Sequence, residues 1–270
     1  MSASEKQIMI DGTLIVLGRE TGEGDGTIET HADRLREWGV ADAVLAKRYG
    51  ETWTPTVDGD GRFDDGPVFV VPTCLVETTE TRKAVSSVAT EIGDSVCCCE
   101  PVGRSPAITD AIADRAVEHL DPDPDTSLVL VGLGSSSMPQ SRLTLEYHER
   151  RLRDQTDYGE VTSAYLVQDP AVECARYNAV NDRIVAVPVF ITPTAVTEEE
   201  IPAKLEVDRG GIEYADPIGT HPRVTDAIHS EVVKQHVLRT HVGDSASAAV
   251  DRLDADFDSP VATDGMESSR

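Results

Sequence analysis

The chain has 270 residues, with 49 Asp and Glu against 24 Lys and Arg, and a formal net charge of −25. A phosphate backbone or an anionic bilayer is bound through a basic surface, so nucleic acid and membranes are excluded as main partners. The length fits one large or two small domains, and the 39% of hydrophobic residues is enough for a core.

The acidic residues are dispersed along the whole chain, and only 5 lysines stand beside 19 arginines. Such a surface repels itself in dilute buffer, whereas concentrated salt screens the repulsion with a Debye length of about 3 Å at 1 M. Residues 1–10 have neither a basic start nor a long apolar run, so no export signal is expected. The composition therefore predicts a halophilic, cytoplasmic protein.

In the first half of the chain, short apolar runs alternate with amphipathic stretches, which is typical of a parallel α/β sheet. We expect strands at 13–17, 43–46, 68–71 and 95–99, and helices at 30–38, 79–92 and 106–120. Residues 50–66 are dominated by Gly, Asp and Pro and are predicted to be a loop.

The second half has the same alternation. We expect strands at 127–132, 161–167, 184–191 and 212–215, and helices at 138–154, 170–179, 197–207 and 222–235. Thr197 with Glu200 fits a capping box at the start of one helix. Residues 243–270 contain much Asp and Ser and few large apolar side chains, which predicts a mostly disordered acidic tail.

The two halves are similar to each other at a constant offset of 116 residues. The matching pairs are 17–18 with 133–134, 71–72 with 187–188, and 101–112 with 217–228. The acidic, proline-rich residues 121–125 suit a linker between the two copies. The sequence thus predicts two Rossmann-like α/β/α units in tandem, 1–121 and 124–240, each with a parallel sheet.

In an open parallel sheet, ligands bind beyond the carboxyl ends of the strands. Gly132, Gly134, Ser135 and Thr194 follow predicted strands of the second unit and are candidates for substrate binding. The run 132–137 has neither a dinucleotide fingerprint nor a P-loop, so a nucleotide is not expected. Two such units facing each other would form a cleft suited to a large flat ligand.

Five short motifs occur in an order that resembles the sirohydrochlorin chelatases, which insert cobalt, iron or nickel in cobalamin, sirohaem and related tetrapyrrole pathways. They lie at 128–135, 165–170, 185–191, 200–202 and 217–222. The resemblance covers most of 124–236 and, more faintly, 10–120, as in the long two-domain members of that family. It implies a class II chelatase fold, a tetrapyrrole substrate and a divalent metal ion as second substrate, with cobalt favoured over iron or nickel.

The resemblance also implies histidines that carry the family's chemistry, and this chain departs from that pattern. The corresponding positions hold Leu133 and Val196 in the second unit, and Leu17 and Glu80 in the first. Leucine and valine cannot bind a metal ion, so Glu80 remains as a candidate ligand and catalytic residue, which Glu51 could assist. The alternative for Glu80 is a solvated charge in the first turn of a helix, where the helix dipole favours it.

Among the histidines, His221 lies in a loop after the last predicted strand and is the second catalytic candidate, with a surface turn as its alternative. His31 and His148 fall within predicted helices and are expected to be half-exposed surface residues. We expect either a cobaltochelatase-type lyase or a non-catalytic paralogue that binds a tetrapyrrole, a metal or a catalytic chelatase partner. The family resemblance favours the enzyme, and the missing histidines favour the paralogue.

Overall fold

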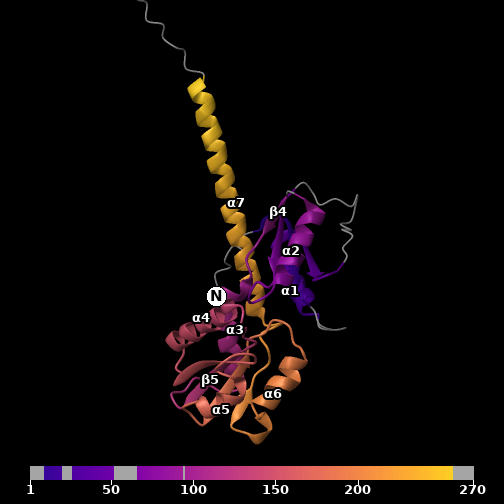
Figure 1. Cartoon of the computed structure of the whole chain (residues 1–270). Coiled ribbons are helices and arrows are strands. Elements are labelled where there is room, and N and C mark those ends of the chain that lie inside the picture. The colour runs from indigo at the N-terminus through magenta and orange to yellow at the C-terminus, as the bar shows by residue number, and fades with distance from the viewer. Residues whose placement is uncertain (1–8, 20–25, 52–65, 94, 258–270) are drawn as a thin grey trace, which may run out of the picture. The chain divides into compact units, whose positions relative to one another are not determined.

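The computed structural model describes residues 9–19, 26–51, 66–93 and 95–257, with side chains described up to residue 240 (Figure 1). Most of the predicted loop at 50–66, and residues 258–270 of the predicted tail, lie outside these ranges. The described residues contain two four-stranded sheets in which every strand pair is parallel.

The first sheet has the order β2-β1-β3-β4. Its elements, in chain order, are β1 (Ile10–Gly18), α1 (Thr27–Glu37), β2 (Ala41–Arg48), β3 (Val68–Pro72), α2 (Thr79–Ile92), β4 (Val96–Cys98), η1 (Val102–Arg104) and α3 (Pro106–Val117). The central strand β1 is almost wholly buried because helices cover both faces of the sheet, and its sequence is accordingly a continuous apolar run.

The second sheet has the corresponding order β6-β5-β7-β8. Its elements are β5 (Thr126–Gly132), α4 (Pro139–Gln155), β6 (Glu160–Tyr165), η2 (Val172–Cys174), α5 (Ala175–Asn178), β7 (Arg183–Pro188), η3 (Val196–Glu200), α6 (Ile201–Lys204), η4 (Val207–Arg209), β8 (Ile212–Tyr214) and α7 (Pro222–Phe257). Both sheets are flanked by helices, so the fold is two α/β units, as predicted.

Among the described residues, three apolar clusters hold these layers together. The first joins the inner faces of both sheets through residues of α1, α3, α4 and the start of α7, such as Leu35, Ile112, Leu152 and Ile228. The second lies on the outer face of the first sheet, where Val88 of α2 packs. The third lies on the outer face of the second sheet, beneath α5 and α6. The two sheets therefore share one core and each has an outer core of its own.

Several element boundaries differ from those predicted. Helix α7 continues to Phe257, beyond its predicted end near Gln235, and so includes residues 243–257 of the predicted tail. Thr197 lies inside the π-helical turn η3, and its hydroxyl accepts a hydrogen bond from the Thr194 amide (2.9 Å) and not from the helix start that a capping box requires. By internal contacts, residues 1–233, which include both sheets, form one compact body, and residues 234–270 form another.

The prediction that His31 and His148 are half-exposed is wrong, because both side chains are completely buried. Each sits on the side of its helix that packs into the shared core, where polar partners are supplied from distant parts of the chain. Among the described residues, no helix combines the length and the apolar character that a bilayer crossing needs.

Candidate functional site

A hydrogen bond between described residues connects the carboxyl ends of the two sheets. Arg19 follows directly after β1, and its carbonyl oxygen accepts a hydrogen bond from the Thr192 hydroxyl (3.0 Å), which lies beyond β7. Because ligands of parallel sheets bind beyond the carboxyl ends of the strands, this contact joins the candidate-site loops of the two α/β units.

The first unit has a cavity of ≈ 370 Å³ at this end of its sheet. Residues from the end of β1, from β2 and the turn after it, and from α2 line it: Leu17, Lys47, Arg48, Tyr49, Gly50, Glu51, Glu80, Lys83, Ala84, Ser87 and Glu91. The structure thus brings the two predicted metal ligands, Glu51 and Glu80, to the lining of one cavity.

Glu80 lies in the first turn of α2, which Thr78 caps by accepting a hydrogen bond from the Thr81 amide (3.1 Å). The helix dipole favours a carboxylate there. Glu80 also forms an ion pair with Arg19, and both side chains are about half-exposed. Glu51 is held differently, since its Oε2 accepts a hydrogen bond from the Arg48 amide (3.1 Å). A metal ion at Glu80 would have to displace Arg19.

Lys47, which was not among the predicted site residues, also lines the cavity. Its side chain is only 4% exposed, and Nζ donates to Glu91 Oε2 at 2.8 Å. The hydrogen bond from Lys47 lowers the pKa of Glu91, so this carboxylate stays ionised. The signal that could have found Lys47 is its place at the carboxyl end of a strand, next to Arg48.

The predicted substrate-binding residues of the second unit shape the loop after β5. A Cβ at Gly132 would lie 2.7 Å from Leu145 Cδ2, so this glycine allows α4 to approach the strand. Gly134 has φ +74°, and the Ser135 amide donates to Gln168 Oε1 at 2.9 Å. Ser135 Oγ accepts from the Met138 amide (3.0 Å) just before α4. These contacts fix the loop while leaving Leu133 54% exposed.

Thr194 belongs to the loop after β7, where its backbone exchanges two hydrogen bonds with the Thr197 hydroxyl. It is three residues beyond Ile191 and two beyond Thr192, which contacts the first unit. Thr194 is therefore at the carboxyl end of its sheet, as predicted.

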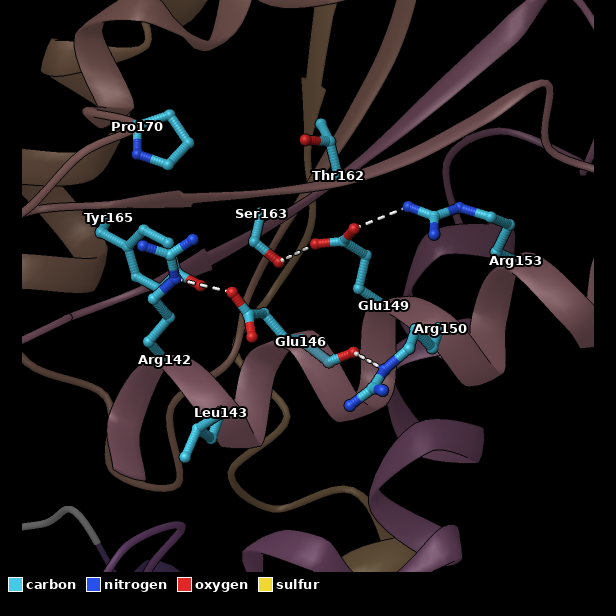
Figure 2. A pocket seen from close by; sticks show the side chains of 10 residues that line it. All are labelled: Arg142, Leu143, Glu146, Glu149, Arg150, Arg153, Thr162, Ser163, Tyr165 and Pro170. Atoms are coloured by element: carbon cyan, nitrogen blue, oxygen red, sulfur yellow. Dashed lines mark hydrogen bonds and ion pairs between the residues drawn. The ribbon is translucent and has the colours of Figure 1, made fainter. Parts of the chain in front are cut away.

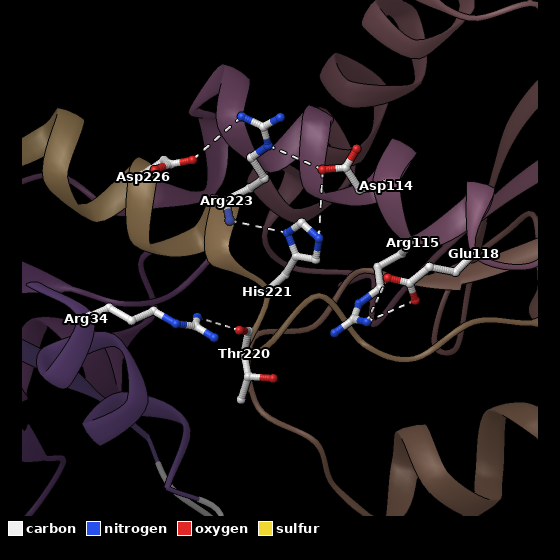
Figure 3. Close-up of polar contacts among 8 residues, drawn as sticks. All are labelled: Arg34, Asp114, Arg115, Glu118, Thr220, His221, Arg223 and Asp226. Carbon is white, nitrogen blue, oxygen red and sulfur yellow. Dashed lines mark hydrogen bonds and ion pairs between the residues drawn. The ribbon is translucent and has the colours of Figure 1, made fainter. Parts of the chain in front are cut away.

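His221 is not among the residues that line the cavity with Glu80. It precedes α7, and its ring lies against α3, with Nε2 3.8 Å from Asp114 Oδ2 and Nδ1 accepting from the Arg223 amide at 3.3 Å (Figure 3). Burial, together with nearby Arg115, lowers the pKa of His221. The structure therefore does not bring the two predicted catalytic residues, His221 and Glu80, to the same cavity, because the loop before Pro222 directs the imidazole toward α3.

A larger hollow of ≈ 550 Å³ lies along α4 and β6 and contains none of the predicted site residues. Its acidic and basic side chains pair with one another: Arg142 with Glu146 and Arg153 with Glu149, both at 2.6 Å, while Ser163 donates to Glu149 at 2.8 Å (Figure 2). The third arginine of the lining, Arg150, donates to the backbone carbonyl oxygen of Glu146 (3.2 Å), so the hollow has three basic side chains against two acidic ones. Within the described ranges, no three His, Cys, Asp or Glu side chains are grouped as a metal site would require.

Comparison with known proteins gives one consistent family. Residues 127–235 match the CbiX family model. A curated relative, a probable sirohydrochlorin cobaltochelatase from Halobacterium salinarum, is 25% identical over 260 residues, covering 80% of this chain and 88% of the relative.

Solved structures of similar fold include SirB from Bacillus subtilis with Fe³⁺, with a TM-score of 0.68 and 18% identity over 84% of this chain and 96% of the other. The structure of CbiX, the terminal enzyme of sirohaem biosynthesis in denitrifying bacteria, aligns with a TM-score of 0.60 and 15% identity over 83% and 98% of the two chains. These two likenesses concern the fold. The match of residues 127–235 to the CbiX model and the curated relative support the small tetrapyrrole chelatase family for this chain.

Proposed function

We propose that the chain is a sirohydrochlorin-type chelatase that inserts a divalent metal ion into a tetrapyrrole. The observation that carries this proposal is the cavity of the first unit, where Glu51 and Glu80 stand at the carboxyl end of the sheet of a chelatase-family protein. Carboxylates can hold Co²⁺, Ni²⁺ or Fe²⁺ in a mixed site. We favour cobalt because the curated relative is named a cobaltochelatase, and keep iron and nickel as alternatives.

Metal insertion exchanges one divalent ion for two pyrrole N–H protons, so the site needs ligands that release the ion and groups that accept protons. Glu80 and Glu51 can serve in both ways, because an ionised carboxylate binds a metal ion or a proton. The tetrapyrrole is itself rich in carboxylates. Its arrival would offer Arg19 a competing partner and thereby free Glu80 for the metal ion.

We assign the loops around Ser135 and Thr194 to binding of the macrocycle from the second unit. The exposed Leu133 in that loop provides an apolar contact for a flat ring. His221 stays a weaker candidate for proton transfer: its lowered pKa keeps the imidazole neutral and able to accept a proton, but it contacts α3 and not the cavity.

The second candidate function is a non-catalytic paralogue that binds a tetrapyrrole, a metal or a catalytic chelatase partner. The observation that favours it is the identity of the residues at the family's histidine positions. Leu17 is fully buried, Leu133 is an exposed apolar side chain, and Val196 lies in η3, so none of the three can hold a metal ion. Glu80, at the fourth position, is already paired with Arg19.

One experiment separates the two functions. The purified chain is mixed with sirohydrochlorin and Co²⁺ in molar salt, and the absorption spectrum of the metallated product is followed. A rate above that of the uncatalysed reaction, lowered by Glu80→Ala, supports the chelatase. Binding of the tetrapyrrole without turnover supports the paralogue. Turnover unchanged in Glu80→Ala would remove Glu80 from the mechanism.

We further propose that the two α/β units are tandem copies with boundaries at 1–121 and 124–240, and that the chain works in the cytoplasm of a salt-adapted cell. The same strand order in both sheets supports the duplication. The net charge of −25 and the Halobacterium relative support the salt adaptation.

A further inference from the structure

A buried histidine of the first unit is bonded to the second. His31 lies on α1 with no exposed surface. Its Nδ1 is 2.8 Å from the Thr225 hydroxyl at the start of α7, and its Nε2 is 2.9 Å from the Gly219 carbonyl oxygen in the loop after β8. Both partners belong to the opposite α/β unit, nearly 200 residues further along the chain.

The second unit returns the same contact. His148 lies on α4, also fully buried. Its Nδ1 is 2.9 Å from the Thr109 hydroxyl of α3, and its Nε2 is 2.6 Å from the Gly103 carbonyl oxygen in η1, the helical turn after β4. Thr109 and Gly103 stand 116 positions before Thr225 and Gly219, and His148 follows His31 by 117. The two units thus exchange equivalent contacts.

The partners determine how each imidazole is protonated. A carbonyl oxygen can only accept, so Nε2 carries the proton and Nδ1 accepts from the threonine hydroxyl. An arginine completes each chain of hydrogen bonds: Arg151 Nε donates to the Thr109 hydroxyl at 3.2 Å, and Arg34 Nη1 approaches the Thr225 hydroxyl at 3.5 Å. Each histidine therefore uses both ring nitrogens, and removing the ring leaves buried polar groups unpaired.

The two glycines connect these histidines with the candidate site. A Cβ at Gly103 would lie 1.8 Å from the Leu75 carbonyl oxygen, and a Cβ at Gly219 would lie 2.5 Å from that of Ile191. Leu75 belongs to the loop that leads from β3 to α2 and Glu80, and Ile191 to the loop that contains Thr194. Each glycine is thus packed directly against the site loop of its own unit.

We propose that His31 and His148 are positioning residues, each of which holds the site loop of the opposite unit through a glycine. His148 of the second unit fixes Gly103 and, with it, residues 73–80 of the first. His31 of the first unit fixes Gly219 and residues 190–197 of the second. That these two segments are site loops rests on the proposed function. The positioning itself is measurable without any substrate.

The test is hydrogen–deuterium exchange of the full-length chain in molar salt, read by mass spectrometry for the wild type, His148→Leu and His31→Leu. We expect His148→Leu to speed exchange in peptides covering 73–81, where the Thr73 amide is bonded to Leu17 (2.7 Å). We expect His31→Leu to do so in peptides covering 189–198, where the Val189 amide is bonded to Val131 (2.8 Å). The increase should be on the order of tenfold, as for loss of one buried hydrogen bond.

The matched control is His119→Leu, which alters an exposed histidine and should leave both loops unchanged. His148→Gln and His31→Gln keep an amide donor for the glycine carbonyl and should give a smaller increase. They also carry the test if the leucine variants do not fold. Faster exchange confined to the substituted residue's own unit, or spread evenly over both, would overturn the proposal. If the wild type inserts no metal while the two variants still show faster exchange in the opposite unit, the proposed function is refuted and the positioning role stands.

Discussion

At the scale of single residues, the Arg19–Glu80 ion pair competes with the metal ion. Arg19→Ala removes that competition, so we expect the variant to bind Co²⁺ about 2–5 times more tightly than the wild type, the range that an exposed ion pair allows. Glu80→Gln should bind Co²⁺ more weakly. Isothermal titration calorimetry with Co²⁺ in molar salt measures both changes.

The matched control for that titration is Arg82→Ala. Arg82 also pairs with a glutamate near the start of α2, Glu77, at 3.2 Å, but neither residue lines the cavity with Glu80. An equal gain in affinity in Arg82→Ala would show that general loss of positive charge is responsible. An unchanged affinity in Arg19→Ala would mean that Glu80 does not hold the ion.

Site residues could be predicted where the local sequence determines their position in the fold. They could not be predicted where contacts with distant parts of the chain determine it. Glu80 was identified because it occupies a position where the resemblance implies a histidine, and Glu51 because it lies near the end of a predicted parallel strand, where ligands bind. Lys47 and the burial of His31 and His148 were missed. From the sequence alone, a lysine in a strand or a histidine in a helix is expected to be exposed. The partners that bury these three side chains, Glu91, Thr225 and Thr109, lie 39–194 positions away along the chain.

At the scale of elements, the close approach of Gly103 to Leu75 predicts which glycine substitution is more damaging. Alanine at Gly103 must displace a carbonyl oxygen at 1.8 Å, whereas alanine at Gly219 meets one at 2.5 Å. We expect Gly103→Ala to lower the free energy of unfolding by about 3 kcal/mol and Gly219→Ala by less, in the range of overpacked sites. Urea unfolding in molar salt gives both values. The reverse order would contradict the packing described for these loops.

The elements that were predicted well are those whose burial determines the order of apolar and polar residues along them. β5, expected at 127–132 and found at Thr126–Gly132, is buried on both faces and is therefore apolar throughout. α7 was predicted to end near Gln235, and residues from 243 onward were predicted to be a tail because they contain much Asp and Ser, yet the helix continues to Phe257. Between Gly243 and Phe257 the sequence has no proline or further glycine and therefore no stop signal for a helix, so composition alone misjudged the length of α7.

At the scale of the whole molecule, the two buried histidines predict that stability falls in acid. Burial lowers the pKa of both His31 and His148 to about 4, and neighbouring arginines (Arg34 for the first, Arg151 and Arg104 for the second) act in the same direction. The unfolded chain takes up a proton near pH 6.5, whereas the folded chain does so only near pH 4. The stabilisation is therefore complete above pH 6.5 and is lost as pH falls toward 4.

Each histidine should account for about 2 kcal/mol of the stability lost between pH 7.5 and pH 5. The measurement is urea unfolding at both pH values for the wild type, the double variant His31→Gln/His148→Gln and the control His119→Gln. The double variant should lose less stability on acidification than the wild type, and the control should match the wild type. Equal losses in all three would assign the acid sensitivity to other groups, such as the carboxylates.

The net charge of −25 acts on the whole molecule and predicts that the chain needs salt to fold stably. Salt weakens both the ion pairs, such as Arg142–Glu146, and the repulsion among unpaired acidic residues. With 49 acidic side chains against 24 basic ones, repulsion outweighs attraction, so the melting temperature should rise as KCl increases from 0.1 M to 2 M. Glu198→Gln/Glu199→Gln, which neutralises two exposed charges in η3, should rise less steeply because it has less repulsion to screen. A melting temperature that falls with KCl would mean that the ion pairs dominate. If the melting temperatures of the wild type and this variant rise equally with KCl, the salt acts through the solvent and not through these charges.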